Sequence, residues 1–250
     1  MTTVTKNNPI IIIPARMGAS RFYGKPLQLI NNVPMVIKIM KQAEAANIAK
    51  VVVATPDEEI ANVVTKNKGT AVITSKNCTT GTDRIAEAIN ILDPNQEHNI
   101  VINLQGDLAI FDNEVLVSTW QALEKHSNFD IATPCTLITN ETHINNPNTV
   151  KAVVSFFNNS NCGKGLYFTR STCPYGKGDL YQHLGIYAYK RKALENFVKA
   201  APSILEQREN LEQLRALELG LNIVVVKVNS VPLEVNTPED LDIILKKLQT

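Results

Sequence analysis

The sequence predicts an α/β fold, with a doubly wound, mostly parallel sheet and a smaller β-rich excursion. Continuous runs of β-branched residues at 10–13 and 51–54 are typical of strands buried on both faces of a parallel sheet. Stretches with apolar residues at helical spacing separate such runs, which is typical of strands joined by right-handed crossovers. After residue 130 this alternation stops, and strand-like segments follow one another with little helix between them.

The expected elements follow in chain order. In the first half, strands are expected at 10–13, 51–54, 70–74 and 100–104, and helices from Pro34, up to Lys66, at 83–92 and from Asn113. In the second half, strands are expected at 130–137, 150–157, 183–189 and 223–228, and helices at 207–218 and 238–248. Without a repeat or a linker, residues 1–250 are expected to form one domain, with the β-rich excursion at 130–190.

Composition excludes several classes of function. The 25 basic and 24 acidic residues give a net charge of +1, so the chain lacks the basic excess of a nucleic-acid-binding protein. The four cysteines show neither CxxC spacing nor a zinc pattern, which favours reduced thiols in a cytoplasmic protein. The polar start lacks the order of a secretion signal, and the apolar run at 10–13 is too short to span a membrane.

A loop with three cations follows the first expected strand. Residues 13–27 read IPARMGASRFYGKPL and include Arg16, Arg21 and Lys25, with Gly18 and Gly24 between them. The loop is neither a P-loop nor a GxGxxG turn, and three cations alone would equally suit a solvated basic loop. Its place at the carboxyl end of a buried strand, where α/β sheets bind ligands, favours an anion site that suits a triphosphate.

The expected strand at 100–104 ends in Gln105-Gly106-Asp107. A carboxylate at this edge of the sheet could hold Mg²⁺ together with phosphate oxygens. Gly-Asp is also an ordinary turn, so this signal is weak without support from other residues.

Further motifs extend these two along the chain. They are VVVATPDEEI, TTGTDRIAEA, VINLQGD, NPNTVKAV, LYFTRS, HLGIYAY, LEQRENLEQLRALELG and NTPEDL. In this order and spacing, from Pro9 to Leu248, the chain resembles the CMP-Kdo synthetases (3-deoxy-manno-octulosonate cytidylyltransferases). The resemblance implies a nucleotidyltransferase on a nucleotide-binding sheet that converts CTP and Kdo, an acidic sugar, to CMP-Kdo and pyrophosphate for lipopolysaccharide synthesis.

The same resemblance implies the site residues. Arg16, Lys25 and Asp107 would be catalytic. The nucleotide would contact Ala15, Arg16, Gly18, Arg21, Lys25, Gly81, Thr82 and Gln105. The sugar would contact Arg170, His183, Tyr187, Glu212 and Gln213, and Mg²⁺ would contact Asp107 and Asn236. It also implies a cytoplasmic homodimer without nucleic-acid or membrane partners, with the 130–190 excursion for sugar binding and dimerisation.

Several of these residues also have a purely structural interpretation. Thr82 or Asp83 is an ordinary helix N-cap, and both roles are compatible. His183 and Tyr187 would suit a core, and Glu212 with Arg215 would suit an exposed helix pair worth about 0.2–0.5 kcal/mol. These alternatives stay open from the sequence.

The chain also departs from the family pattern. Asn236 stands where the family usually has Asp, and an amide is a poorer Mg²⁺ ligand than a carboxylate. Leu108 and Ala109 replace a usual Glu-Pro, Phe22-Tyr23 replaces a usual Leu-Pro, and the stretch from 170 to 183 is short. Two alternatives follow: a cytidylyltransferase for another acid sugar, such as an amino-Kdo or a sialic-acid-like compound, or a catalytically weakened nucleotide-binding homologue.

Overall fold

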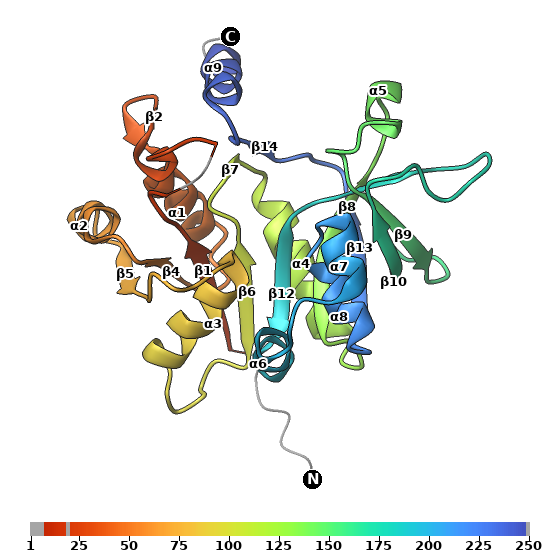
Figure 1. Ribbon diagram of the computed structural model, residues 1–250, viewed down its shortest axis with the longest axis horizontal. Helices are drawn as coiled ribbons and strands as arrows, with labels where there is room; N and C mark the ends of the chain where they lie inside the picture. Colours follow the sequence, from red (N-terminus) through yellow and green to blue (C-terminus); the bar gives the residue numbers. More distant parts are fainter. Residues whose placement is uncertain (1–7, 19–20, 249–250) are drawn as a thin grey trace. The chain divides into compact units, whose positions relative to one another are not determined.

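The computed structural model describes residues 8–18 and 21–248 (Figure 1). Most of the polar amino-terminal stretch considered above, and Ala19 and Ser20 of the first loop, lie outside the described residues. The chain divides into two compact units: the first runs up to Asn113 and resumes at Pro232, and the second takes Glu114–Val231. We expected one domain with an excursion at 130–190; the second unit contains that stretch and extends beyond it at both ends.

Four parallel strands form the sheet of the first unit. In space their order is β5 (Thr70–Ile73), β4 (Lys50–Thr55), β1 (Pro9–Pro14) and β6 (Ile100–Leu104). Every residue of β1 and β6 is buried, as the β-branched runs predict for central strands. Because the strands are parallel, the carboxyl ends of β1 and β6 lie at the same edge of the sheet.

Helices connect these strands as the spacing of apolar residues predicts. They are α1 (Met35–Ala45), α2 (Glu58–Lys66) and α3 (Gly81–Leu92). Val36, Ile39, Met40 and Ala43 of α1 are all buried, which confirms the predicted apolar face. The third helix begins two residues before the predicted start and packs against β1, β4, β5 and β6.

Short elements complete the first unit. They are the 3₁₀ turn η1 (Lys25–Leu27), the pair β2 (Leu29–Ile30) and β3 (Val33–Pro34), β7 (Leu108–Ile110), β14 (Leu233–Glu234) and α9 (Pro238–Lys247). An antiparallel pairing of β14 with β7 attaches the returning chain directly after Asp107. Thr237 caps α9 with the reciprocal bonds of a capping box, Asp240 being its partner.

The sheet of the second unit is mixed. Its strands lie in the order β11 (Tyr181–His183), β9 (Lys151–Phe156), β10 (Cys162–Thr169), β13 (Ile223–Val228), β8 (Ile131–Leu137) and β12 (Ile186–Lys190). Only β13 and β8 are paired in parallel among these strands; the other pairs are antiparallel. The helices are α4 (Asn113–Lys125), which begins at the boundary, α5 (Glu141–Ile144), α6 (Arg191–Lys199), α7 (Ile204–Glu209) and α8 (Gln213–Glu218).

Two predictions for the second unit are wrong in detail. The strand expected at 183–189 is broken at Leu184, between β11 and β12. Leu184 lies opposite Pro134 of β8, and its N–H donates to the Pro134 carbonyl. Proline has no N–H, so it cannot donate a ladder hydrogen bond in return. The helix expected at 207–218 is two helices, because Asn210 takes the left-handed conformation (φ 54°) and ends α7.

Three elements of the second unit were not predicted: strand β10, helix α6 and the four-residue helix α5. Strand β10 contains Gly163 and Gly165, which lower the strand signal; a Cβ at Gly163 would lie 2.5 Å from the carbonyl oxygen of Ser155. Helix α6 buries Ala193, Leu194 and Phe197, a spacing that is visible in the sequence.

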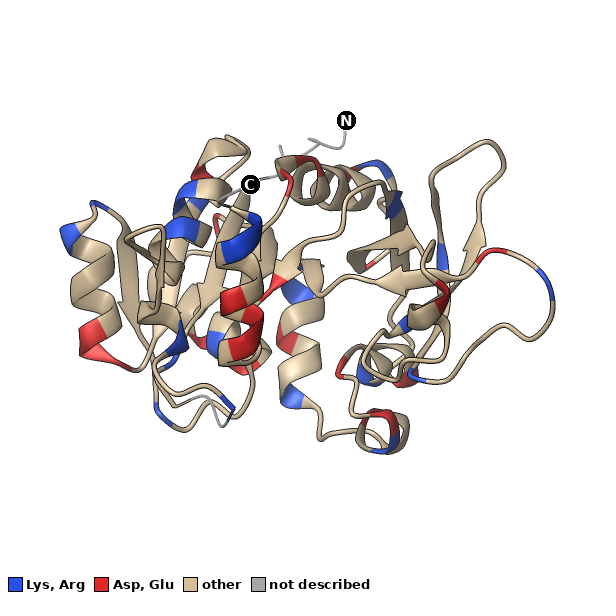
Figure 2. Ribbon diagram, turned by 90° about the horizontal axis from the view of Figure 1, so that it is seen from above, with Lys and Arg blue, Asp and Glu red and all other residues tan. Residues whose placement is uncertain are grey.

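Lys and Arg segments and Asp and Glu segments are interspersed over the helices, as the near-neutral net charge suggests (Figure 2). Within residues 8–18 and 21–248, no helix has the length and apolar character needed to cross a bilayer.

Candidate active site

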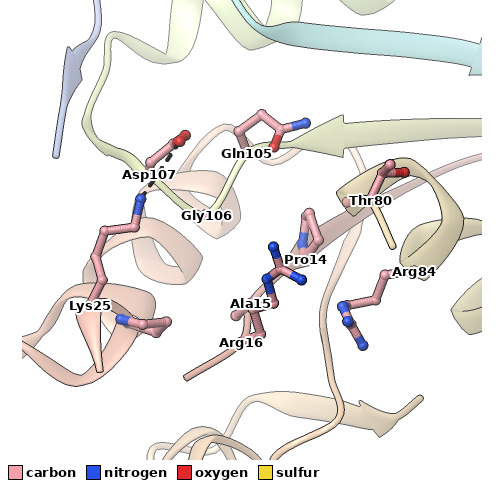
Figure 3. A pocket seen from close by; sticks show the side chains of 11 residues that line it. Pro14, Ala15, Arg16, Lys25, Thr80, Arg84, Gln105, Gly106 and Asp107 are labelled. Atoms are coloured by element: carbon pink, nitrogen blue, oxygen red, sulfur yellow. Dashed lines mark ion pairs between the residues drawn. The ribbon is translucent and has the colours of Figure 1, made fainter. Parts of the chain in front are cut away.

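A cavity of about 220 Å³ opens in the first unit beside the carboxyl ends of β1 and β6. Figure 3 shows its lining. The lining residues are Pro14, Ala15, Arg16, Lys25, Pro26, Thr80, Gly81, Arg84, Gln105, Gly106 and Asp107. The cavity therefore brings together the first loop, the start of α3 and the Gln105-Gly106-Asp107 turn, three segments that sequence analysis singled out separately.

Pro14 is the point against which these segments pack. A Cβ at Gly106 would lie 2.4 Å from the carbonyl oxygen of Pro14, and one at Gly81 would lie 3.2 Å from its Cγ. Gly106 is thus required for close approach of the two strand ends, whatever its backbone angles. Gly18, in contrast, is exposed, and a Cβ there would meet nothing within 4 Å.

Backbone bonds hold the first loop over the end of β1. Gly24 takes a left-handed conformation (φ 70°) and donates its N–H to Met17 O, while Met17 N donates to Asp57 Oδ2. Lys25 follows at the start of η1, and its Nζ donates to Val235 O at 2.9 Å. The same ammonium lies 3.7 Å from Asp107 Oδ2, the contact drawn as a dashed line in Figure 3.

Positive charge predominates in the lining. Arg16, Lys25 and Arg84 contribute three cations, and Asp107 is the one carboxylate among the described lining residues. Burial, together with the neighbouring charge of Arg16, lowers the pKa of Arg84. Two guanidinium groups close enough to repel each other favour an anion between or beside them, so the cavity suits a polyphosphate.

Two lining residues with polar side chains, Thr80 and Arg84, were not among the predicted site residues. Arg84 extends from α3 and is buried, and its guanidinium donates to Thr74 Oγ1, Ser75 O and Cys78 O. Its place in TTGTDRIAEA was visible in the sequence, but a helical arginine next to an aspartate resembles a surface residue.

The N-cap expected at Thr82 or Asp83 is wrong, because Thr80 is the cap of α3. Thr80 Oγ1 accepts from Asp83 N, and Asp83 Oδ2 accepts from Thr80 N, a reciprocal capping box. Thr82 is buried and does not belong to the lining, whereas Gly81 does. The N-terminus of α3 thus lies at the cavity, and the positive end of the helix dipole favours an anion there.

Oxygen donors for a metal lie near the Lys25 side of the cavity. Asp107 contributes one carboxylate, and β14 carries Glu234, two residues before Asn236. No group of three or more His, Cys, Asp or Glu side chains suited to a metal occurs among the described residues. Mg²⁺ commonly takes one or two carboxylates and completes its shell with water and substrate phosphates, so this donor set fits Mg²⁺ bound together with a triphosphate.

Glu234 and Asn236 interact directly. Asn236 Nδ2 donates to Glu234 Oε2 at 3.3 Å, and Asn236 Oδ1 accepts from Arg21 Nη2 at 3.5 Å. Burial of the carboxylate and the neighbouring charge of Asp107 raise the pKa of Glu234, although the residue as a whole remains exposed. Arg21 itself does not belong to the cavity lining.

The residues expected to bind sugar belong to the second unit, and His183 is the most constrained of them. Its Nε2 lies 2.9 Å from Thr133 Oγ1, and its ring packs edge-on against Phe168. The Thr133 hydroxyl has one proton, which it gives to the carbonyl of Ile186 or Leu184, so His183 Nε2 must donate and Nδ1 is left as an acceptor. Burial lowers the pKa of His183 to about 3, which keeps the ring neutral.

Tyr187 and Gln213 form a second polar pair in this unit. The Tyr187 hydroxyl donates to Gln213 Oε1 at 3.2 Å, and burial together with the charge of Glu212 raises the Tyr187 pKa. Gln213 is 5% exposed, and its Nε2 has no hydrogen-bond partner among the residues that the structure describes. A buried amide donor without a partner is costly, which is typical of a site completed by a ligand.

The expected ion pair of Arg215 with Glu212 is the weaker of two, because the main partner of Arg215 is Glu206. Arg215 is buried, forms two bonds with the carboxylate of Glu206, and stacks over the Phe197 ring at 4.4 Å; Glu212 lies 4.0 Å away. This network fixes α8, which begins with Gln213.

Arg170 serves the framework of the second unit. Its guanidinium donates to the carbonyl oxygens of Glu209, Pro147 and Asn210, and its backbone N–H donates to the Glu209 carboxylate. Three of the five guanidinium N–H groups are therefore engaged by loops, and contact with a sugar carboxylate remains a prediction.

Known proteins resemble the chain over almost its full length. A family model described as Cytidylyltransferase matches residues 10–223. A 3-deoxy-manno-octulosonate cytidylyltransferase from Parvibaculum lavamentivorans is 44% identical over 94% of this chain and 90% of its own length. One from Rhodopseudomonas palustris is 48% identical over 93% of this chain and 94% of its own.

Solved structures agree with these matches. A structure of CMP:2-keto-3-deoxy-manno-octonic acid synthetase complexed with CTP superposes with a TM-score of 0.89 and 34% identity, over 97% of this chain and 99% of that one. A 4-diphosphocytidyl-2C-methyl-D-erythritol synthase from Anaerococcus prevotii, at 14% identity and a TM-score of 0.66 over 98% and 99%, shows likeness of fold alone.

The α/β fold and the cationic cavity at the ends of β1 and β6 are those of a nucleotidyltransferase, and the matching family model makes the chain a cytidylyltransferase. Within that class, the relatives that are 44% and 48% identical over more than nine-tenths of this chain identify the family. The chain belongs to the 3-deoxy-manno-octulosonate cytidylyltransferase family.

Proposed function

We propose that the protein transfers the cytidylyl group of CTP to Kdo, giving CMP-Kdo and pyrophosphate. The observation that carries the proposal is the cavity in which Arg16, Lys25 and Arg84 surround the carboxyl ends of β1 and β6. The strand order β5-β4-β1-β6 supports our proposal of a doubly wound sheet, in which nucleotides bind at the switch point, here between β1 and β6.

The cations of the cavity have a defined electrostatic task. When the sugar hydroxyl attacks the α-phosphorus and pyrophosphate leaves, negative charge grows on the phosphate oxygens. Arg16, Lys25 and Arg84, with the N-terminus of α3, stabilise this charge with donors that the fold already holds in place. Gln105 and the backbone of Ala15 line the same cavity and position the nucleotide.

The second unit contributes polar groups that suit a polyhydroxylated acid. Gln213 Nε2 is a buried donor with capacity for a ligand, and His183 Nδ1 is an acceptor for a hydroxyl. Tyr187 orients the Gln213 amide through its hydroxyl, and the charge of Glu212 acts on the Tyr187 hydroxyl. Substrate specificity in this proposal depends on these groups more than on Arg170.

Mg²⁺ is part of the proposal, held by Asp107 and by oxygens of the triphosphate, and it would neutralise phosphate charge and orient the pyrophosphate for departure. We further propose a cytoplasmic homodimer, as the resemblance implies, with the β-rich part at 130–190 in sugar binding and dimerisation.

The test is pyrophosphate release with each nucleoside triphosphate and a panel of acid sugars. We expect turnover with CTP and Kdo, dependence on Mg²⁺, and far slower turnover with UTP or ATP. Preference for an amino-Kdo or a sialic-acid-like compound would replace the sugar in the proposal and keep the transfer. Binding of CTP without release of pyrophosphate from any sugar would instead identify a weakened homologue.

A further inference from the structure

The chain that returns from the second unit passes Asp107 as an extended segment. Val235 in this segment is fully buried, so Glu234 and Asn236 on either side of it project toward the opposite face together. Their head groups meet there: Asn236 Nδ2 lies 3.3 Å from Glu234 Oε2. The longer side chain of Glu234 thus brings a carboxylate within one hydrogen bond of the Asn236 amide.

The side-chain oxygen and nitrogen of Asn236 both form hydrogen bonds with neighbouring side chains. Its Oδ1, the atom that could bind a metal, accepts from Arg21, and its Nδ2 donates to Glu234. Its backbone N–H donates to Asp240, which ties the residue to the start of α9. In this arrangement Asn236 orients the carboxylate of Glu234, and its side-chain oxygen is engaged by Arg21.

Backbone pairing places Glu234 beside Asp107. Glu234 lies opposite Leu108 in the β14–β7 pair, and Val235 N donates to Asp107 O at 2.9 Å. Lys25 lies at the same place, with its Nζ bonded to Val235 O and 3.7 Å from Asp107 Oδ2. A cation therefore already lies between the Asp107 turn and the segment that carries Glu234.

We propose that Glu234 supplies the second carboxylate that holds Mg²⁺ with Asp107 and the triphosphate, and that Asn236 is a positioning residue for Glu234. The inference rests on the proposed function, because the metal is bound with CTP. Its chemical basis is that Mg²⁺ selects carboxylate oxygens over amide oxygens.

The experiment measures Mn²⁺, a spin-active substitute for Mg²⁺, by electron paramagnetic resonance as it binds the protein with CTP and no sugar. The variants are Glu234→Gln, Asn236→Ala and the double change Glu234→Gln with Asn236→Asp. Glu239→Gln is the matched control, since it removes the same charge from an exposed position five residues further on. CTP affinity in excess chelator reports separately on the fold and the nucleotide cavity.

We expect Glu234→Gln to weaken Mn²⁺ binding by about 10–100-fold, the range that losing even an outer partner of a metal site costs. Asn236→Ala should weaken it less, the control should leave it unchanged, and the added Asn236→Asp change should restore Mn²⁺ binding to the Glu234→Gln protein. A larger loss in Asn236→Ala than in Glu234→Gln would overturn the inference, as would an unchanged Glu234→Gln. Failure of the wild type to bind CTP at all would instead count against the proposed function.

Discussion

Lys25 has two acceptors that lie far from it in sequence, Val235 O, 210 residues away, and Asp107. Its side chain lines the cavity and is 14% exposed, and Asp107 lies 3.7 Å from its ammonium rather than in close contact. A cation held in this way meets charge that grows during transfer, so its contribution is larger in the transition state than in the ground state.

We therefore expect Lys25→Ala to lower kcat by about 10²–10³, or about 2.7–4 kcal/mol, the cost of losing one preorganised donor. The KM for Kdo should change little, because the residues proposed to bind the sugar belong to the other unit. Steady-state kinetics measure both, with the exposed Lys76→Ala as the control. A Lys25→Ala enzyme as fast as the control would show that the loop is a solvated basic turn.

His183 gives a prediction about pH. Its pKa falls from 6.5 to about 3 on burial, so the unfolded chain takes up a proton below about 6.5 while the folded protein does not. Its contribution to stability is therefore complete above that pH and is lost progressively as the pH falls toward 3.

When the pH is lowered from about 7 to 5, protonation of His183 in the unfolded chain should lower the unfolding free energy by about 2 kcal/mol. The His183→Gln variant has an uncharged side chain that can still donate to Thr133. In this variant the loss of unfolding free energy that comes from His183 should disappear. Urea unfolding of both proteins at the two pH values measures the difference. Equal pH dependence would mean that His183 is accessible to protons in the folded protein.

At the scale of elements, the approach of the β6 turn to the end of β1 builds the cavity. A methyl group at Gly106 would overlap the Pro14 carbonyl at 2.4 Å, and backbone on both sides leaves little room to adjust. We expect Gly106→Ala to destabilise the protein by about 1–3 kcal/mol, as overpacking does, and to weaken CTP binding.

Gly18→Ala is the matched control for thermal unfolding, because a Cβ at Gly18 meets nothing within 4 Å. For CTP titration the reference is the wild type, since Gly18 is itself a predicted nucleotide contact. If Gly106→Ala unfolds at the wild-type temperature and binds CTP normally, the turn is looser than the structure indicates.

The elements that could be predicted are those with a strong, continuous pattern. The β1 run and the α1 face were predicted because burial determines their residue choice over a whole element. Strand β10 was missed because close packing at Gly163 requires a residue that weakens the strand signal. The break at Asn210 was missed because the apolar spacing continues across it, and one left-handed residue leaves little trace in a sequence.

The same contrast applies to the site. Arg16, Lys25 and Asp107 could be predicted because each follows a buried strand, and strand ends converge in α/β sheets. Arg84 and Thr80 belong to the start of a helix, where capping explains such residues equally well. The contact of Lys25 with Val235, and that of Asn236 with Glu234, depend on how the returning chain pairs with β7, which no local pattern determines.

For the whole molecule, we propose that the nucleotide binds to the first unit and that the sugar binds to residues of the second. Neither unit alone has both sets of groups, since the cations of the cavity and the Tyr187–Gln213 pair belong to different units. The central claim is therefore that the intact chain joins the two substrates.

The direct measurement is phosphorus NMR of the complete reaction, with purified protein, CTP, Mg²⁺ and Kdo. The account predicts that each CTP consumed yields one CMP-Kdo phosphodiester and one pyrophosphate, and that omission of Kdo stops the reaction. Consumption of CTP to CMP without a sugar phosphodiester, or no consumption by a folded protein that binds CTP, would contradict it.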